Sequence, residues 1–283
     1  MGDPGHDTME DEPPLNADSQ VVSSGEPTTQ PIVPGRPLLE TVLVFAGVTA
    51  VTAAITWAPR VLPGMLDYAP ILVGGLFLGV AMKLAQRESG GMRRHGIDLA
   101  GMLVRPDASD PRPAGPLGVL DLARSLQAAA LPALRETGVA LLVAAVVFPP
   151  FVLGFWYWNT PTQPFSLTWP ESVGSFVLTQ LLVVALPEEA LFRGTFQTRL
   201  HDRWPPARRL RITIDPRAWI LTALLFALVH FVSIPHPARL AVFFPGLLFG
   251  LLRAWRGGIG AALLLHAMSN LLSEMLELGW GLR

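Results

Sequence analysis

Apolar residues in this chain of 283 residues gather into long runs that are separated by short polar stretches. The runs are roughly 17–25 residues long, the length that an α-helix needs to cross about 30 Å of hydrocarbon. Because a lipid bilayer offers no water to backbone polar groups, runs of this length are expected to be helical. The pattern therefore predicts an all-α, polytopic transmembrane helical bundle of about seven spans: 38–58, 68–85, 138–157, 173–198, 218–235, 239–255 and 258–279.

Two segments depart from a simple apolar helix. The third run contains Pro149-Pro150, and because proline removes a backbone donor and crowds the preceding turn, we expect that helix to kink or to end early. The segment 117–134 mixes charged and amide side chains with apolar ones. It is expected to be an interfacial amphipathic helix, with an eighth span as the alternative.

Glycines repeat at four-residue spacing in two of the runs. Gly75 and Gly79 share one face of the second run, and Gly246 and Gly250 share one face of the sixth. Small residues at this spacing let membrane helices approach closely, so we interpret both pairs as packing sites.

Composition divides the chain into three parts. Residues 1–37 are rich in Pro, Asp, Glu, Ser and Gly, which predicts a disordered tail. Residues 38–137 hold the first membrane helices, a basic loop and the amphipathic segment, and residues 138–283 hold the other helices. Most arginines fall in alternate loops, so the positive-inside rule predicts that these loops and the amino terminus are cytoplasmic. No RNA- or DNA-binding motif accompanies the arginines, and no nucleic-acid partner is expected.

Two adjacent glutamates, Glu188 and Glu189, lie inside the fourth run. A carboxylate at membrane depth costs several kcal/mol unless it is paired, protonated or functional. Arg193 follows Glu189 by four residues, which is the favourable order for an ion pair on one helix face. Glu188 points about 100° away from Glu189 and has no such partner. We therefore assign Glu189 and Arg193 to a structural ion pair and Glu188 to a functional site.

Three polar residues in later runs reach a depth similar to that of Glu188. Counted at 1.5 Å per residue from the predicted cytoplasmic helix ends, Glu188 is about 16 Å deep, His230 about 20 Å, His266 about 14 Å and Asn270 about 20 Å. One histidine in a membrane helix is often a packing residue, but this convergence favours a site. The other histidines fall in tails or loops and are expected to be solvated: His6, His95, His201 and His236.

Missing residue types narrow the chemistry. The chain has no cysteine, which excludes a thiol nucleophile, disulfides and thiolate metal sites. It also has no His-Glu-x-x-His helix, no Gly-x-Ser-Gly motif and no aspartate inside a predicted span. A glutamate that activates water, assisted by histidines and an asparagine amide, remains. The alternatives are a proton-coupled transporter and a non-enzymatic immunity protein; the chain lacks the repeated halves typical of a transporter.

Three motifs occur in an order and spacing that resemble the CPBP family of intramembrane proteases, which comprises CAAX prenyl endopeptidases and bacteriocin-processing (Abi) proteins. The resemblance spans residues 171–275, and residues 1–137 show none. The family motifs are Glu-Glu-x-x-x-Arg, Phe-x-x-x-His and His-x-x-x-Asn/Asp. They correspond here to Glu188-Glu189-Ala-Leu-Phe-Arg193, Phe226-Ala-Leu-Val-His230 and His266-Ala-Met-Ser-Asn270, and Phe243-x-x-Gly246-x-x-x-Gly250 also fits.

The resemblance implies that residues 138–283 form an intramembrane protease core whose cavity opens toward the membrane and the cytosol. It implies that Glu188 activates water, that His230 assists it, and that His266 and Asn270 line the site and stabilise the oxyanion. Residues in a supporting role would be Glu189, Arg193 and Phe226.

Metal dependence stays open at this point. Glu188, His230 and His266 have the ligand types of a three-ligand zinc site with an open position. A glutamate that ligates zinc, however, could not also act freely as the base, so a metal-free mechanism is favoured and zinc is the alternative.

The expected substrate is a membrane-anchored protein or peptide, and the lipid bilayer is the other expected partner. A carboxyl-terminal sorting anchor, a bacteriocin leader or a regulatory peptide would suit a bacterial member of the family. The high content of Arg, Ala, Leu and Pro points to a bacterium with GC-rich DNA. The predicted location is therefore the bacterial inner membrane, with the amino terminus in the cytoplasm.

Overall fold

The computed structural model describes residues 1–2, 36–88, 90–98, 119–209 and 211–282. All of the helices and strands in this described part belong to one compact unit, Arg36–Arg283. The predicted tail over 1–37 lies almost entirely outside the described residues, and so does most of the predicted basic loop that precedes residue 119.

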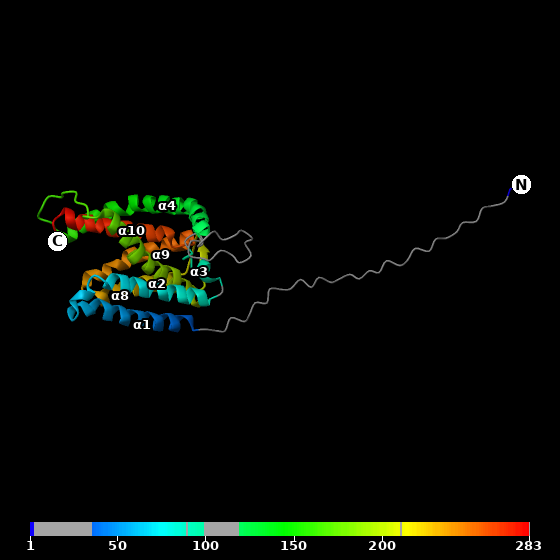
Figure 1. Ribbon diagram of the computed structural model, residues 1–283, viewed down its shortest axis with the longest axis horizontal. Helices are drawn as coiled ribbons and strands as arrows, with labels where there is room; N and C mark the ends of the chain where they lie inside the picture. Colours follow the sequence, from blue (N-terminus) through cyan, green and yellow to red (C-terminus); the bar gives the residue numbers. More distant parts are fainter. Residues whose placement is uncertain (3–35, 89, 99–118, 210, 283) are drawn as a thin grey trace. The chain divides into compact units, whose positions relative to one another are not determined.

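Six helical runs within the described residues are long and apolar enough to cross a membrane, which confirms the all-α membrane bundle. They are Pro37–Arg60, Ala69–Arg87, Ala129–Asn159, Val173–Arg203, Pro216–Ser233 and Pro237–Arg256. The main helices behind them are α1 (Pro37–Trp57), α2 (Ala69–Arg87), α4 (Val119–Asn159), α8 (Pro216–Ser233) and α9 (Phe243–Arg256). Figure 1 shows these helices running side by side. Shorter elements are η1 (Ala58–Arg60), η2 (Pro63–Met65), α3 (Gly91–Arg94), η7 (Pro237–Val242), β1 (Ala207–Arg209) and β2 (Ile212–Ile214).

The seventh predicted span is also a helix, α10 (Gly260–Gly279), but it is not among the six runs that are apolar enough to cross a membrane. Its sequence explains the difference, because His266, Asn270, Glu274 and Glu277 lower its mean hydropathy. α10 packs along α4 and α9. The bundle thus places this more polar helix against neighbours that are themselves apolar.

Helix α4 differs from the prediction in length. The amphipathic segment 117–134 and the span 138–157 were expected as separate elements, but α4 is one helix of 41 residues that includes Pro132, Pro149 and Pro150. The expectation of an early end at Pro149-Pro150 is therefore wrong. A helix that stopped inside an apolar layer would leave several backbone groups without partners, which costs more than the hydrogen bonds that proline removes.

The fourth predicted span is one helical run whose geometry changes along its length. It begins as α5 (Val173–Thr179), widens into the π-helical segment η5 (Gln180–Ala185), tightens in α6 (Leu186–Glu189), widens again in the π-helical segment η6 (Ala190–Phe196) and ends as α7 (Gln197–Arg203). We call this run, Val173–Arg203, the catalytic helix, after the candidate site residues Glu188 and Glu189 that the sequence analysis places on it. It packs against α1, α2, α8, α9 and α10, so it lies at the centre of the bundle.

Phenylalanine side chains form the core around the catalytic helix. Phe192 meets Phe77 of α2 and Phe226 of α8 edge to face, and Phe196 meets Phe45 of α1 in the same way. Four of these five side chains are almost completely buried, and Phe45 packs against them. Such pairs contribute about 0.5–1.5 kcal/mol each beyond the area that they bury. Helices α1 and α2, which lie outside the motif region, therefore hold the catalytic helix in place.

The two glycine pairs behave differently. A Cβ atom at Gly246 would lie 3.3 Å from Arg193 Nη2, and one at Gly250 would lie 2.8 Å from Trp219 Cδ1, so both are close-packing sites as predicted. Gly75 and Gly79 face open space, and the packing interpretation is wrong for them. Their neighbour Gly74 makes the close contact instead, against Val183 of the catalytic helix.

Glu88 joins several segments at one end of the bundle. It accepts hydrogen bonds from Arg199 of the catalytic helix at 2.6 Å and from Arg94 at 2.5 Å, and its Oε2 lies 2.9 Å from His95 Nε2. Arg199 also bonds Glu40 of α1 at 2.6 Å. His95 is fully buried, so the expectation that it is solvated is wrong; its Nδ1 donates to the carbonyl of Gly194. We call Glu40, Glu88 and Arg199 the acid–arginine link.

The remaining histidines lie closer to the prediction. His236 is exposed, and His201 is partly buried and accepts a hydrogen bond from the backbone of Asp215. His6 lies outside the described residues.

Candidate active site

The two glutamates lie on a single α-helical turn, α6, between two π-helical segments. Pro187 precedes them, and its ring cannot donate the hydrogen bond of a regular helix. π-Helical turns are rare and often occur at functional sites, since an extra residue per turn changes which side chains face inward. The backbone geometry alone therefore indicates a functional site around Glu188 and Glu189.

Glu189 is fully buried and tightly bound. Its Oε1 accepts hydrogen bonds from Arg193 Nη1 at 3.0 Å and from His266 Nδ1 at 2.9 Å. Arg193 is also fully buried, and its Nη2 donates to the carbonyl of Gly246 at 3.2 Å. The predicted pair between Glu189 and Arg193 is thus present, and the bond to His266 extends it to α10.

Glu188 is held differently from its neighbour. Its Oε2 lies 3.7 Å from His230 Nε2 and 3.7 Å from His266 Nε2, too far for direct hydrogen bonds. Among the described residues, this oxygen has no hydrogen-bond partner. The Glu188 side chain is 14% exposed and that of His230 is 21%, whereas the side chains of Glu189 and Arg193 are sealed at 0%. Glu188 is therefore the reachable carboxylate of the two.

The hydrogen bonds of the two histidines determine which ring nitrogens face Glu188 as acceptors. His230 Nδ1 lies 2.8 Å from the carbonyl oxygen of Phe226, which can only accept, so Nδ1 carries the proton. His266 Nδ1 donates to the Glu189 carboxylate in the same way. In the neutral rings, both Nε2 atoms are then acceptors that face the Glu188 oxygen. Three acceptors around one point favour a proton, a donating water or a cation between them.

Aromatic rings fix the orientation of these groups. The Phe226 ring lies 4.4 Å from the His230 ring, and Arg193 sits over its face at 4.0 Å. Phe249 of α9 stacks on His266 at 4.9 Å. The sequence analysis did not single out Phe249, although it precedes Gly250 in the pattern that begins at Phe243. The rings exclude water from the buried ion pair, which strengthens it.

Asn270 belongs to the same region but makes a different contact. Its Nδ2 donates to Gln180 Oε1 at 2.8 Å, and Gln180 is the first residue of the π-helical segment η5. Gln180 was also missed from the sequence, although an amide inside an apolar run is a signal of function. The second proton of the Asn270 amide remains free for another acceptor.

Glu188, His230 and His266 have the donor chemistry of a zinc site, but within the described ranges no group of three His, Cys, Asp or Glu side chains is arranged to hold a metal ion. The geometry provides a partly exposed carboxylate with two imidazoles beside it.

A carboxylate–histidine site inside a bundle of membrane helices is compatible with an intramembrane hydrolase. Residues 170–272 match the family described as type II CAAX prenyl endopeptidase Rce1-like. This match covers the whole of the catalytic helix, α8 and α9, and α10 as far as Leu272. The match supports membership of the CPBP family of intramembrane proteases over these residues. No curated protein and no solved structure matches it.

Proposed function

We propose that this protein is an intramembrane endopeptidase in which Glu188 activates the water that attacks a peptide bond. One observation carries the proposal: the Glu188 side chain is partly exposed and its Oε2 lacks a hydrogen-bond partner among the described residues, whereas the Glu189 side chain is fully buried and its Oε1 is bonded to Arg193 and His266. Family membership supports a protease.

The proposed reaction follows from the placement of the acceptors. A water held near Glu188 Oε2 gives a proton to that carboxylate while its oxygen attacks the substrate carbonyl carbon. The carbonyl oxygen becomes an oxyanion, which the free proton of the Asn270 amide can stabilise. Glu188 then passes its proton to the leaving nitrogen as the carbon–nitrogen bond breaks. The products are a carboxylic acid and an amine.

The histidines have a defined part in this scheme. Because Nδ1 of each ring is committed to a hydrogen bond, His230 and His266 can donate toward the substrate only as imidazolium ions. His230 is the more exposed of the two and is proposed to assist Glu188. His266 is held by Glu189, so the buried carboxylate is proposed to stabilise an imidazolium that forms there during the reaction.

The substrate is proposed to be a membrane-anchored protein or peptide, because Glu188 and His230 lie on helical runs that are long and apolar enough to cross a membrane. A bacterial inner membrane, with the amino terminus in the cytoplasm, is proposed as its location. The arginine-rich segments around Arg94, Arg208 and Arg253 meet at one end of the bundle, in keeping with that orientation.

The test is a comparison of Glu188→Gln with the matched surface change Glu171→Gln in purified, reconstituted protein. Glutamine keeps the shape of the side chain but cannot take the proton, so cleavage of membrane-tethered peptides should fall by roughly 10²–10⁴-fold. Mass spectrometry of the products measures the rate and the cleavage position. Turnover by Glu188→Gln at the rate of Glu171→Gln would remove Glu188 from the mechanism.

The metal-free reading is part of this proposal, and elemental analysis of active protein tests it. If the mechanism is metal-free, a strong chelator leaves the cleavage rate unchanged and no stoichiometric zinc accompanies the protein. Stoichiometric zinc, whose removal stops cleavage and whose return restores it, would establish the zinc alternative, with Glu188, His230 and His266 as the ligand types available.

A further inference from the structure

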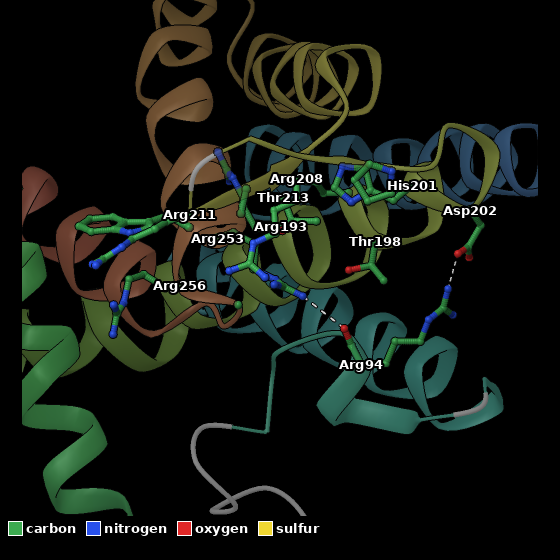
Figure 2. Close-up of a pocket in the computed structure, with 15 residues that line it drawn as sticks. Arg94, Arg193, Thr198, His201, Asp202, Arg208, Arg211, Thr213, Arg253 and Arg256 are labelled. Carbon is green, nitrogen blue, oxygen red and sulfur yellow. Dashed lines mark hydrogen bonds and ion pairs between the residues drawn. The ribbon is translucent and has the colours of Figure 1, made fainter.

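A cavity of about 460 Å³ lies at the end of the bundle where the catalytic helix stops. Its walls come from α7, from the β1–β2 hairpin, from the end of α9 and from α3. Figure 2 shows the arginine side chains that gather in it. We call the cavity the arginine pocket, after six of its lining residues: Arg94, Arg193, Arg208, Arg211, Arg253 and Arg256.

Carboxylates balance only part of this positive charge. Arg94 pairs with Asp202 and Glu88, and Arg256 pairs with Glu136. Asp202 is the one carboxylate among the described residues that line the pocket.

Arg193 pairs with Glu189, and the remaining three arginines of the pocket are less well matched. Among the described residues, Arg208 and Arg211 have no ion-pair partner, and both are exposed. Arg253 feels the charge of Asp98, yet its Nε is buried and has no hydrogen-bond partner in the described part of the chain. The pocket therefore presents guanidinium N–H groups that lack acceptors among the described residues, and a bound anion would accept hydrogen bonds from them.

Backbone packing holds Arg253 in this position. Its Nη2 donates to the carbonyl of Arg94 at 3.3 Å, which Figure 2 marks with a dashed line. Gly96, at a φ of +63°, lies directly behind the guanidinium, and a Cβ atom there would be 2.9 Å from Arg253 Cζ and 2.7 Å from the Gly257 carbonyl oxygen. Glycine tolerates this backbone conformation and this close approach. The guanidinium is thus fixed by the fold, and its orientation does not depend on a surface rotamer.

We propose that the arginine pocket binds a phosphate group. Guanidinium groups pair with phosphate oxygens through two parallel hydrogen bonds, and several of them around one cavity match its charge and geometry. The pocket lies where the runs Val173–Arg203 and Pro237–Arg256 end, the depth at which lipid phosphates are found. Trp255, which lines the pocket beside Arg256, also suits that interface.

Arg193 connects this pocket with the glutamates. It lines the arginine pocket and donates to Glu189, and its own Nε has no hydrogen-bond partner among the described residues. A phosphate bound in the pocket would therefore lie close to the Arg193–Glu189 ion pair, which supports the candidate active site. Binding can be measured by stability alone, so the test does not depend on the proposed reaction.

The experiment uses the full-length protein and a double variant of the two exposed arginines, Arg208→Gln/Arg211→Gln. The matched control is Arg93→Gln/Arg203→Gln, which removes the same charge from two exposed arginines that do not line the pocket. Thermal unfolding is followed in a zwitterionic detergent with inorganic phosphate, against chloride at equal ionic strength. A second arm compares nanodiscs of phosphatidylglycerol with nanodiscs of phosphatidylcholine.

Phosphate is expected to raise the Tm of the wild type and of the control. The pocket variant should need about tenfold more phosphate for the same rise, equivalent to about 1.4 kcal/mol. A lipid source is indicated if phosphatidylglycerol stabilises the protein and is retained in native mass spectrometry, and a soluble source if inorganic phosphate alone acts. An equal response of the two variants, or no response of the wild type to either probe, would overturn the proposal. Stabilisation only by a short peptide with a free carboxylate would also overturn it.

Discussion

Replacement of Arg193 should most clearly separate an effect on the stability of the fold from an effect on the cleavage rate. Its guanidinium is fully buried, bonds Glu189 at 3.0 Å and Gly246 at 3.2 Å, and lies 4.0 Å from the centre of the Phe226 ring. Arg193→Met keeps an unbranched side chain but leaves the Glu189 carboxylate with His266 as its remaining hydrogen-bond partner among the described residues. Breaking a buried ion pair from one side costs roughly 3–5 kcal/mol, because the other charge stays in a low-dielectric interior.

For a chain of this size, that loss corresponds to a fall in Tm of about 6–20 °C. Glu189→Leu should cause a loss of similar size, since it isolates the guanidinium. The double variant Glu189→Leu/Arg193→Met removes both charges and should be more stable than either single variant. Its cleavage rate should nevertheless stay low, because His266 loses the acceptor that orients its ring.

Thermal unfolding in detergent tests the predicted changes in Tm. A cleavage assay on the same samples tests the predicted low cleavage rate of the double variant. The control is Arg217→Met, which breaks a pair of the same length, 3.0 Å, whose arginine side chain is 64% exposed. An exposed pair is screened by solvent and contributes little to stability, so that variant should melt close to the wild type. If Arg193→Met and Glu189→Leu also melt like the wild type, the buried pair does not support the fold and the reasoning fails.

Three further outcomes are expected. Gly250→Ala should destabilise the protein by about 1–3 kcal/mol, because its Cβ would press on Trp219, whereas Gly75→Ala faces open space and should leave the unfolding temperature unchanged or raise it. Gln180→Leu should lower the cleavage rate more than the stability, since it frees the amide of Asn270; equal loss of both would assign Gln180 a packing role. Burial raises the pKa of Glu88, but the hydrogen bond and charge of His95 and the charges of Arg199 and Arg94 outweigh it and hold that pKa below 4.5. The stability that Glu88 contributes is therefore complete above about pH 4.5 and is lost as the pH falls through its folded pKa. In thermal unfolding measured from about pH 6 to pH 3, the Tm of Glu88→Gln should therefore fall less steeply than that of the wild type.

The membrane bundle could be predicted from the sequence because the bilayer imposes one simple rule on span length. Apolar runs of the right length mark helices almost independently of their neighbours. The same logic was weaker for α10, whose His266 and Asn270 bond the catalytic helix, and the early end that it allowed at Pro149 and Pro150 was wrong. Helix continuity at those prolines depends on the surroundings of the backbone, which local sequence does not specify.

The site could be predicted in part. Charge at membrane depth identifies Glu188 and Glu189, and four-residue spacing identifies the partner of Glu189. The bond between Glu189 and His266, by contrast, joins helices that are distant in the sequence, and no local pattern implies it. Regular α-helical phase also gave no sign of the two π-helical segments. The prediction for His95 was wrong because its position in a short connection suggested an exposed side chain. In the structure, its ring nitrogens instead contact Glu88 and the carbonyl of Gly194.

The acid–arginine link has a consequence for how the chain is assembled. Glu40 and Glu88 leave the ribosome well before Arg199, the residue that bonds them both. A partly synthesised chain therefore holds α1 and α2 with their acidic ends not yet joined through that guanidinium, and domains generally become stable only as their later partners arrive. The link closes when the catalytic helix enters the bundle. Nascent chains that stop between residues 189 and 199 consequently contain the glutamates of the site without this polar contact to the first two helices.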